Sequence, residues 1–172
     1  MANEAGEDGT SARLALPLLR AGQAQKEMWH NEALAALDMA VQASVVAVGA
    51  DVPPSAPRPG ECWVVGASPV GDWAGRAGAI AGWTAGGWRF LVPSAGWSVW
   101  SGADAQVARY VDGGWRLGEV SGRQLLIGGV KVVGPRAGSI GDPAGGSLVD
   151  VEVRAAVVAI LQALRIHGLI AT

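Results

Sequence analysis

Apolar side chains recur at helical spacing in the segment that follows residue 30. Asn31 is a favourable helix N-cap, and Glu32 would complement the helix dipole in the first turn. Apolar positions three or four residues apart share one face of a helix. This pattern predicts a helix over about residues 31–47 with one apolar face, and a helical turn over Gln23–Met28 could precede it. The positions on that face are Leu34, Leu37, Val41, Val45 and Val48.

A second helical pattern lies near the end of the chain. Ser147 or Asp150 can cap its start, and Gly168 stands where a glycine often follows a helix. Leu161 and Ile166 lie beside a coiled-coil-like seam, so the apolar arc is wider than a solvent-facing helix needs. Packing of two or three copies explains this arc, and packing on the β region explains it as well. The seam consists of Val153, Val157, Ile160, Leu164 and His167.

Glycine interrupts short runs of tryptophan, valine and isoleucine throughout residues 61–133. This is typical of short strands joined by hairpins. The octapeptides WTAGGWRF (83–90) and YVDGGWRL (110–117) form a weak repeat. A two-residue turn in each places Trp83 opposite Trp88 and Tyr110 opposite Trp115. The segment QLLIGGVKVV (124–133) predicts a further hairpin around its Gly-Gly pair.

Two segments rich in proline and glycine divide the chain. DVPPSAPRPG (51–60) follows the first helix, and GPRAGSIGDPAGG (134–146) precedes the second. We therefore expect an N-terminal arm and helix in residues 1–50, a β-hairpin domain in 51–134, and a linker and C-terminal helix in 135–172. The expected fold class is α+β, with a central antiparallel domain rich in Trp-Gly turns. Contacts between copies are expected at Leu34, Leu37, Val41 and Val45 in the first helix, and at Val153, Val157, Ile160 and Leu164 in the last.

Composition narrows the classes of partner. The net charge of −2 offers no electrostatic case for nucleic acid. Charged residues make up 16% of the chain and apolar residues 50%, a balance that favours surface hidden in an oligomer. No apolar run is long enough for membrane insertion, and the N-terminus does not have the pattern of a signal peptide. Cys62, the sole cysteine, lies in a predicted buried strand.

No catalytic, cofactor or metal site is expected. His30, Glu32 and Asp38 do not have the spacing of a metal-ligand motif, so no metal is predicted. His30 and His167 fall on helices outside the β region, which excludes a Ser-His-Asp arrangement there. No phosphate-binding glycine pattern is present. Glu61, Asp72, Asp104, Asp112 and Glu119 could in principle supply a carboxylate pair for glycoside hydrolysis.

The aromatic residues admit two interpretations. As cross-strand pairs they stabilise hairpins, and as exposed rings they stack on sugars. Trp97 and Trp100 are three positions apart, so on one strand they face opposite sides of the sheet. One ring is then left for solvent or for a subunit interface. The candidate saccharide-binding residues are Trp83, Trp88, Trp97, Trp100, Tyr110 and Trp115.

The stretch GQAQKEMWHNEALAALDMAVQ (22–42) resembles the AQK…HNEAL…LD…VQ signature of a family of unknown function. That family occurs in prophages and gene transfer agents, usually in tail-fibre or other tail-associated genes. The resemblance continues through PRPGECWVVG (57–66), the Trp-Gly hairpins and the C-terminal helix, and covers about residues 14–170.

The resemblance implies a non-enzymatic structural protein of a phage-like tail, made in the bacterial cytoplasm and placed in the virion. It implies a homotrimer, with tail or baseplate proteins and a host surface polysaccharide as further partners. The chain is short for a receptor-binding fibre, which favours a connector or short fibre. The alternatives are a free-standing carbohydrate-binding module and a small glycan hydrolase.

Overall fold

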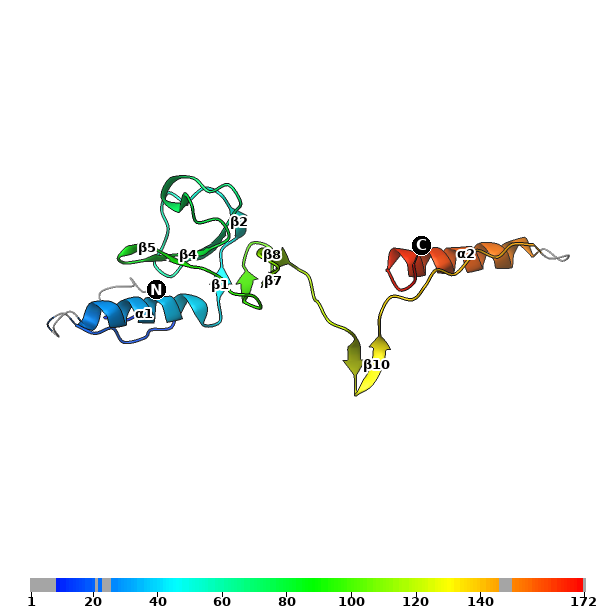
Figure 1. The fold of residues 1–172 in the computed structure, drawn as a ribbon, viewed down its shortest axis with the longest axis horizontal. Coiled ribbons are helices and arrows are strands. Elements are labelled where there is room, and N and C mark those ends of the chain that lie inside the picture. Colours follow the sequence, from blue (N-terminus) through cyan, green and yellow to red (C-terminus); the bar gives the residue numbers. More distant parts are fainter. Residues whose placement is uncertain (1–8, 21, 23–25, 146–149, 172) are drawn as a thin grey trace. The chain divides into compact units, whose positions relative to one another are not determined.

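The computed structural model describes residues 9–20, 22, 26–145 and 150–171. It has α+β composition and divides into two compact units, Met1–Glu119 and Val120–Thr172 (Figure 1). These units differ from the three parts that the linkers suggest. The first helix and the β region belong to one unit, because the strands that follow the helix join the sheets.

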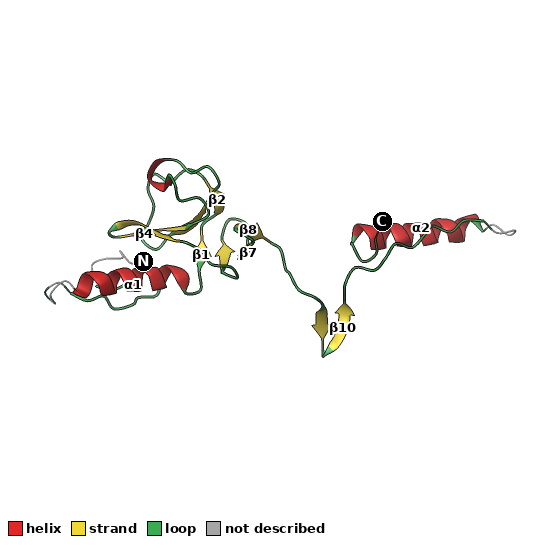
Figure 2. Ribbon diagram, viewed as in Figure 1, coloured by secondary structure: helices red, strands yellow, loops and turns green. Residues whose placement is uncertain are grey.

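Two helices, ten strands and one 3-10 turn make up the described chain (Figure 2). The first unit contains α1 (Lys26–Ala40), β1 (Ser44–Val45), β2 (Val48–Ala50), β3 (Cys62–Val65), η1 (Gly71–Trp73), β4 (Ile80–Thr84), β5 (Gly87–Leu91), β6 (Ser98–Ser101), β7 (Gln106–Val111) and β8 (Gly114–Leu117). The second unit contains β9 (Leu125–Ile127), β10 (Val130–Val133) and α2 (Val151–Ile166).

The first unit contains two four-stranded sheets of the same design. In one, β3, β4 and β5 form an antiparallel meander, and β2 pairs parallel to β3. In the other, β6, β7 and β8 form the meander, and β1 pairs parallel to β6. The repeated octapeptides form the last hairpin of each meander, β4–β5 and β7–β8. The sequence repeat therefore marks equivalent positions in two similar sheets.

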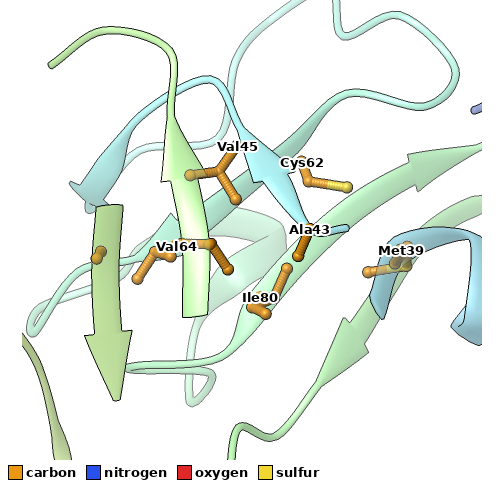
Figure 3. Packing of buried hydrophobic residues seen from close by; sticks show 8 residues of the cluster. Met39, Ala43, Val45, Cys62, Val64 and Ile80 are labelled. Carbon is orange, nitrogen blue, oxygen red and sulfur yellow. The ribbon is translucent and has the colours of Figure 1, made fainter. Parts of the chain in front are cut away.

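One core cluster lies between the two sheets (Figure 3). Met39 brings the end of α1 into this core, and its Sδ lies 2.7 Å from where a Cβ on Gly82 would stand. A side chain at position 82 would force the Met39 thioether to shift, so Gly82 leaves the room that Met39 fills against β4. The buried members of the cluster are Met39, Ala43, Val45, Cys62, Val64, Ile80, Val99 and Ala108.

A second core cluster covers the opposite face of the β3–β4–β5 sheet. Trp73 is 0% exposed, and its ring centroid lies 5.1 Å from that of Trp88 and 6.0 Å from that of Trp63. Alternate residues of β3 enter the two clusters, so all four of its residues are buried. Strands of this kind read as continuous apolar runs, as CWVV does here.

The predicted bounds of the first helix, 31–47, are wrong. The helix begins at Lys26 and ends at Ala40. Asn31 is not its cap: the side-chain amide accepts the Leu19 N–H and donates to the Leu19 carbonyl, both at 2.9 Å. Val45 and Val48 lie on strands, where β-branched residues pack well. Because Val45 is buried inside this unit, it is not available for contacts between copies.

An N-terminal arm explains why α1 ends where it does. Buried Asp38 accepts hydrogen bonds from the Ser11 hydroxyl at 2.6 Å and from the Leu14 N–H at 2.7 Å. The Arg13 guanidinium in turn donates to the carbonyls of Asp38 and Gln42 at the helix C-terminus. A cation there satisfies carbonyls that have no partner within the helix. The arm thus packs on its own chain.

The second unit contains the β9–β10 hairpin and α2. The Asp150 carboxylate accepts the Val153 N–H at 2.9 Å, which confirms one of the two predicted caps, while Ser147 lies outside the described residues. Gly168 has a φ of +70°, the left-handed conformation expected after the helix. The preceding linker packs on the end of α2 through the Arg165–Asp142 ion pair at 2.9 Å.

Candidate functional site

The two predicted aromatic pairs form, and both serve packing. Trp83 lies opposite Trp88 with ring centroids 4.9 Å apart, and Tyr110 lies opposite Trp115 at 5.4 Å. All four side chains are half-buried and approach edge to face. Trp115 also donates its indole N–H to the Gly78 carbonyl at 2.8 Å, which joins the two sheets. The Trp83–Trp88 pair therefore stabilises its hairpin and the second core cluster, while Trp115 stabilises its hairpin and packs against the first core cluster between the sheets.

The side chains of Trp97 and Trp100 point to opposite faces of the sheet, as their spacing predicts. Trp97 packs against the first core cluster. Trp100 is 47% exposed on the other face. Of the six rings proposed for saccharide binding, all of which the structure describes, Trp100 is the one with the most open surface. Sequence reasoning missed a further exposed ring, Trp29 on α1, which is 75% exposed.

A cavity of about 260 Å³ lies between the arm, α1 and the β4–β5 turn. Its polar side chains are engaged within the protein. Asn31 holds Leu19, Asp38 holds the arm, and Glu32 accepts two hydrogen bonds from Arg89 at 2.6 and 2.7 Å. The hydrogen bond from Arg89 lowers the pKa of Glu32. The cavity wall therefore fastens α1 to its surroundings rather than presenting groups to a ligand.

The candidate residues for metal binding and catalysis lie at separate positions in the fold and do not form one site. Glu32 and Asp38 make the contacts above, and His30 is exposed on α1. In the part of the chain that the structure describes, no three His, Cys, Asp or Glu side chains gather closely enough to hold a metal ion. The other histidine, His167, forms the C-cap of α2.

The carboxylates weighed for glycoside hydrolysis include two with local partners. Glu61 accepts the Arg58 N–H at 2.8 Å, and Asp104 accepts the Ser101 hydroxyl at 2.6 Å. Asp72 lies in η1, Asp112 occupies the β7–β8 turn with a φ of 51°, and Glu119 ends the first unit. The two bonded carboxylates stabilise turns, which is an ordinary role for these residue types.

Cys62 is buried in the first core cluster. Burial raises the pKa of its thiol from the ordinary value of 9.0 to about 11. The thiol, not the thiolate, is then the form present near neutral pH, and the thiol is a poor nucleophile. The residue acts as a small apolar side chain, as its sequence context predicts.

This shift has a testable consequence. At pH 8 a disulfide reagent such as DTNB is expected to leave Cys62 of the folded protein unmodified and to titrate it fully in urea. Because the folded pKa lies above the unfolded one, the thiol stabilises the fold at low pH. This contribution, on the order of 2 kcal/mol, is lost as the pH rises from about 9 to about 11. Cys62→Ala should flatten that part of the stability profile. Equal modification rates in the folded and unfolded protein would contradict the assignment.

The second unit exposes apolar side chains on both faces of its hairpin. Val130 lies opposite Ile127, and Val133 lies opposite Leu125. A lone two-stranded hairpin is marginally stable in water, and this one has little polar surface to offer solvent. Its exposed apolar residues are Leu125, Leu126, Ile127, Val130, Val132 and Val133.

The seam predicted on α2 is also open. Val153 is 56% exposed and Ile160 is 59% exposed, and Val157 is exposed as well. Leu161, beside the seam, is buried. The helix therefore uses one edge of its apolar arc within its own unit and leaves Val153, Val157 and Ile160 of the seam uncovered there, while Leu164 is half-buried. An uncovered apolar stripe of this length is typical of a protein–protein contact.

Residues 30–116 match the family described as "Protein of unknown function (DUF2793)". The match runs from α1 through both four-stranded sheets to β8. No curated protein matches the chain. None of the helices in the described residues is both long and apolar enough to cross a membrane.

Proposed function

The chain belongs to the DUF2793 family, and from that premise we propose that it is a structural component of a phage-like particle, a tail fibre or fibre connector. The region that matches the family, residues 30–116, lies within the first unit. The second unit joins copies of the chain into a homotrimer. The resemblance to proteins of prophage and gene transfer agent tails supports the particle, and the apolar surface of the second unit supports the assembly.

The observation that carries the proposal is the apolar surface of the β9–β10 hairpin and α2. Ile127 and Val130 form one cross-strand apolar pair, while Leu126 faces the other way from the hairpin. Both hairpin faces therefore need cover. Cover from identical chains is the simplest source, because each copy brings the same surface to a closed symmetric assembly.

The seam of α2 supports an arrangement in which copies meet along this helix. Val153 and Ile160 are seven residues apart, and Val157 and Leu164 are also seven apart. A seven-residue apolar repeat keeps one stripe facing its partners along a left-handed coiled coil. Parallel copies bring equivalent positions to the same level of the bundle. In the proposed trimer, the seams of three chains form its axis.

The α1 helix offers a surface for docking to other tail or baseplate proteins. Trp29, Leu37 and Val41 are exposed, and Leu34 is half-buried. Leu37 and Val41 are four residues apart and lie next to each other at the C-terminal end of α1 and just beyond it, and Trp29 lies near the N-terminal end. Sister chains are a second occupant that the proposal allows for this surface.

The mass of the purified full chain in solution tests the proposal. Light scattering after size exclusion is expected to give three times the chain mass of 17.5 kDa. This mass should persist on dilution, because a buried coiled-coil seam and covered hairpins make a continuous apolar interface. A stable monomer would overturn the assembly and favour a free-standing carbohydrate-binding module, which exposed Trp100 would suit. A dimer would overturn the trimer.

A further inference from the structure

The sheet β1–β6–β7–β8 has one face in the core and one face open. Val99 and Ala108 point into the first core cluster and lie opposite each other. Because side chains alternate along a strand, their neighbours point the other way. We call this second face the outer face. Its residues on the three antiparallel strands include Ser98, Trp100, Val107, Arg109 and Arg116.

Two arginines lie directly opposite each other on the outer face. Arg109 of β7 pairs with Arg116 of β8 in the register of the hairpin. Like charges at such positions destabilise a sheet. Among the described residues, neither guanidinium has an ion-pair partner. Arg116 lies on the edge strand β8, where a charged side chain discourages aggregation. Arg109 lies on an inner strand of the sheet, so protection of an edge does not explain its charge.

An exposed indole lies next to this pair. Trp100 of β6 is opposite Val107, which is two positions before Arg109 on the same strand and face. A diagonal neighbour of this kind lies about 7–8 Å away, within reach of long side chains. Trp100 and Val107 are both exposed. The outer face thus combines a flat apolar ring with two guanidinium groups that lack a local counter-charge.

We propose that the outer face binds an acidic polysaccharide that carries carboxylate groups. A guanidinium fork fits a carboxylate with two parallel hydrogen bonds. The indole face suits the apolar face of a sugar ring, since aromatic side chains combine apolar area with defined geometry. A polyuronate supplies both features along an extended chain. This inference names the class of ligand for host-surface attachment. It rests on the proposed function in one respect only, namely that the protein meets this ligand on a host surface.

Two other occupants fit the outer face less well. A nucleic acid needs many positive contacts to its phosphates, and the chain has a net charge of −2. A second copy in a two-fold contact would bring its own Arg109 and Arg116 against the same pair. A carboxylated sugar polymer needs only the local pair and the ring.

The test measures binding of the full chain to polygalacturonate, with dextran of similar length as the neutral probe. Polygalacturonate is expected to bind and dextran is not, and binding should weaken with added salt. Arg116→Glu should weaken binding about tenfold or more. The change removes one guanidinium, and the new carboxylate pairs with the guanidinium of Arg109. The same change replaces a like-charge pair with an opposite-charge pair, so the urea midpoint should hold or rise. Trp100→Ala should also weaken binding.

Arg123→Glu is the matched control, because it makes the same charge change in the second unit. It should leave binding close to that of the natural chain. Equal binding of dextran, or equal losses from Arg123→Glu and Arg116→Glu, would overturn the site. So would single-stranded DNA that binds with the same dependence on Arg109, Arg116 and Trp100. Light scattering of the same samples separates the two proposals: a trimer without binding overturns this inference alone, and a monomer with binding overturns the fibre alone.

Discussion

Replacing Val153 and Ile160 with aspartate is expected to reduce the solution mass to that of one chain, 17.5 kDa. Both side chains are more than half exposed in the single chain, so the substitutions should cost its own unit little. In the proposed bundle they occupy equivalent seam positions. Each copy would then place two carboxylates in an apolar axis, where an unpaired buried charge costs several kcal/mol, on the order of 3–5.

A matched double variant isolates the seam. Ala155→Asp with Gln162→Asp adds aspartates at the same seven-residue spacing on the same helix. Both positions are exposed and lie away from the seam. This control should keep three times the chain mass under the same light-scattering conditions. If the Val153→Asp, Ile160→Asp protein also keeps that mass, α2 does not hold the copies together.

Replacing Trp73 with alanine is expected to lower the free energy of unfolding by about 3–5 kcal/mol. The side chain is 0% exposed and contacts the rings of Trp63 and Trp88, so its removal leaves a large cavity. Urea unfolding followed by tryptophan fluorescence or circular dichroism measures the change. The loss is a large part of the stability of a typical domain, so partial unfolding near 37 °C is expected.

Two further variants check the physical reason. Trp29→Ala makes the same chemical change at a ring that is 75% exposed, and should change stability by less than about 0.5 kcal/mol. Trp73→Phe should cost less than Trp73→Ala. It fills part of the space and removes an indole N–H that has no hydrogen-bond partner among the described residues. Similar unfolding midpoints for Trp73→Ala and Trp29→Ala would show that the tryptophan cluster is not a structural core.

Local rules were enough to predict the hairpins and the two ends of α2. A two-residue turn and the alternation of side chains determine which residues oppose each other, so Trp83–Trp88 and Tyr110–Trp115 follow from the turn alone. The cap at Asp150 and the glycine at 168 likewise act within one turn of helix. The same register also places Arg109 opposite Arg116, so that pair was open to prediction from the sequence.

Contacts between distant segments decided the rest. The bounds of α1 depend on the arm, since Asn31 forms hydrogen bonds to Leu19 and the Arg13 guanidinium donates to carbonyls at the C-terminal end of the helix. Val45 has helical spacing in the sequence, yet the parallel pairing of β1 with β6 draws it into the core. Which rings are buried depends on contacts between distant segments, and Trp73 becomes core only because Trp63 and Trp88 meet it on one face of the β3–β4–β5 sheet. Hydrophobic periodicity indicates which side chains avoid water. Packing across the whole chain decides which partner covers each of them.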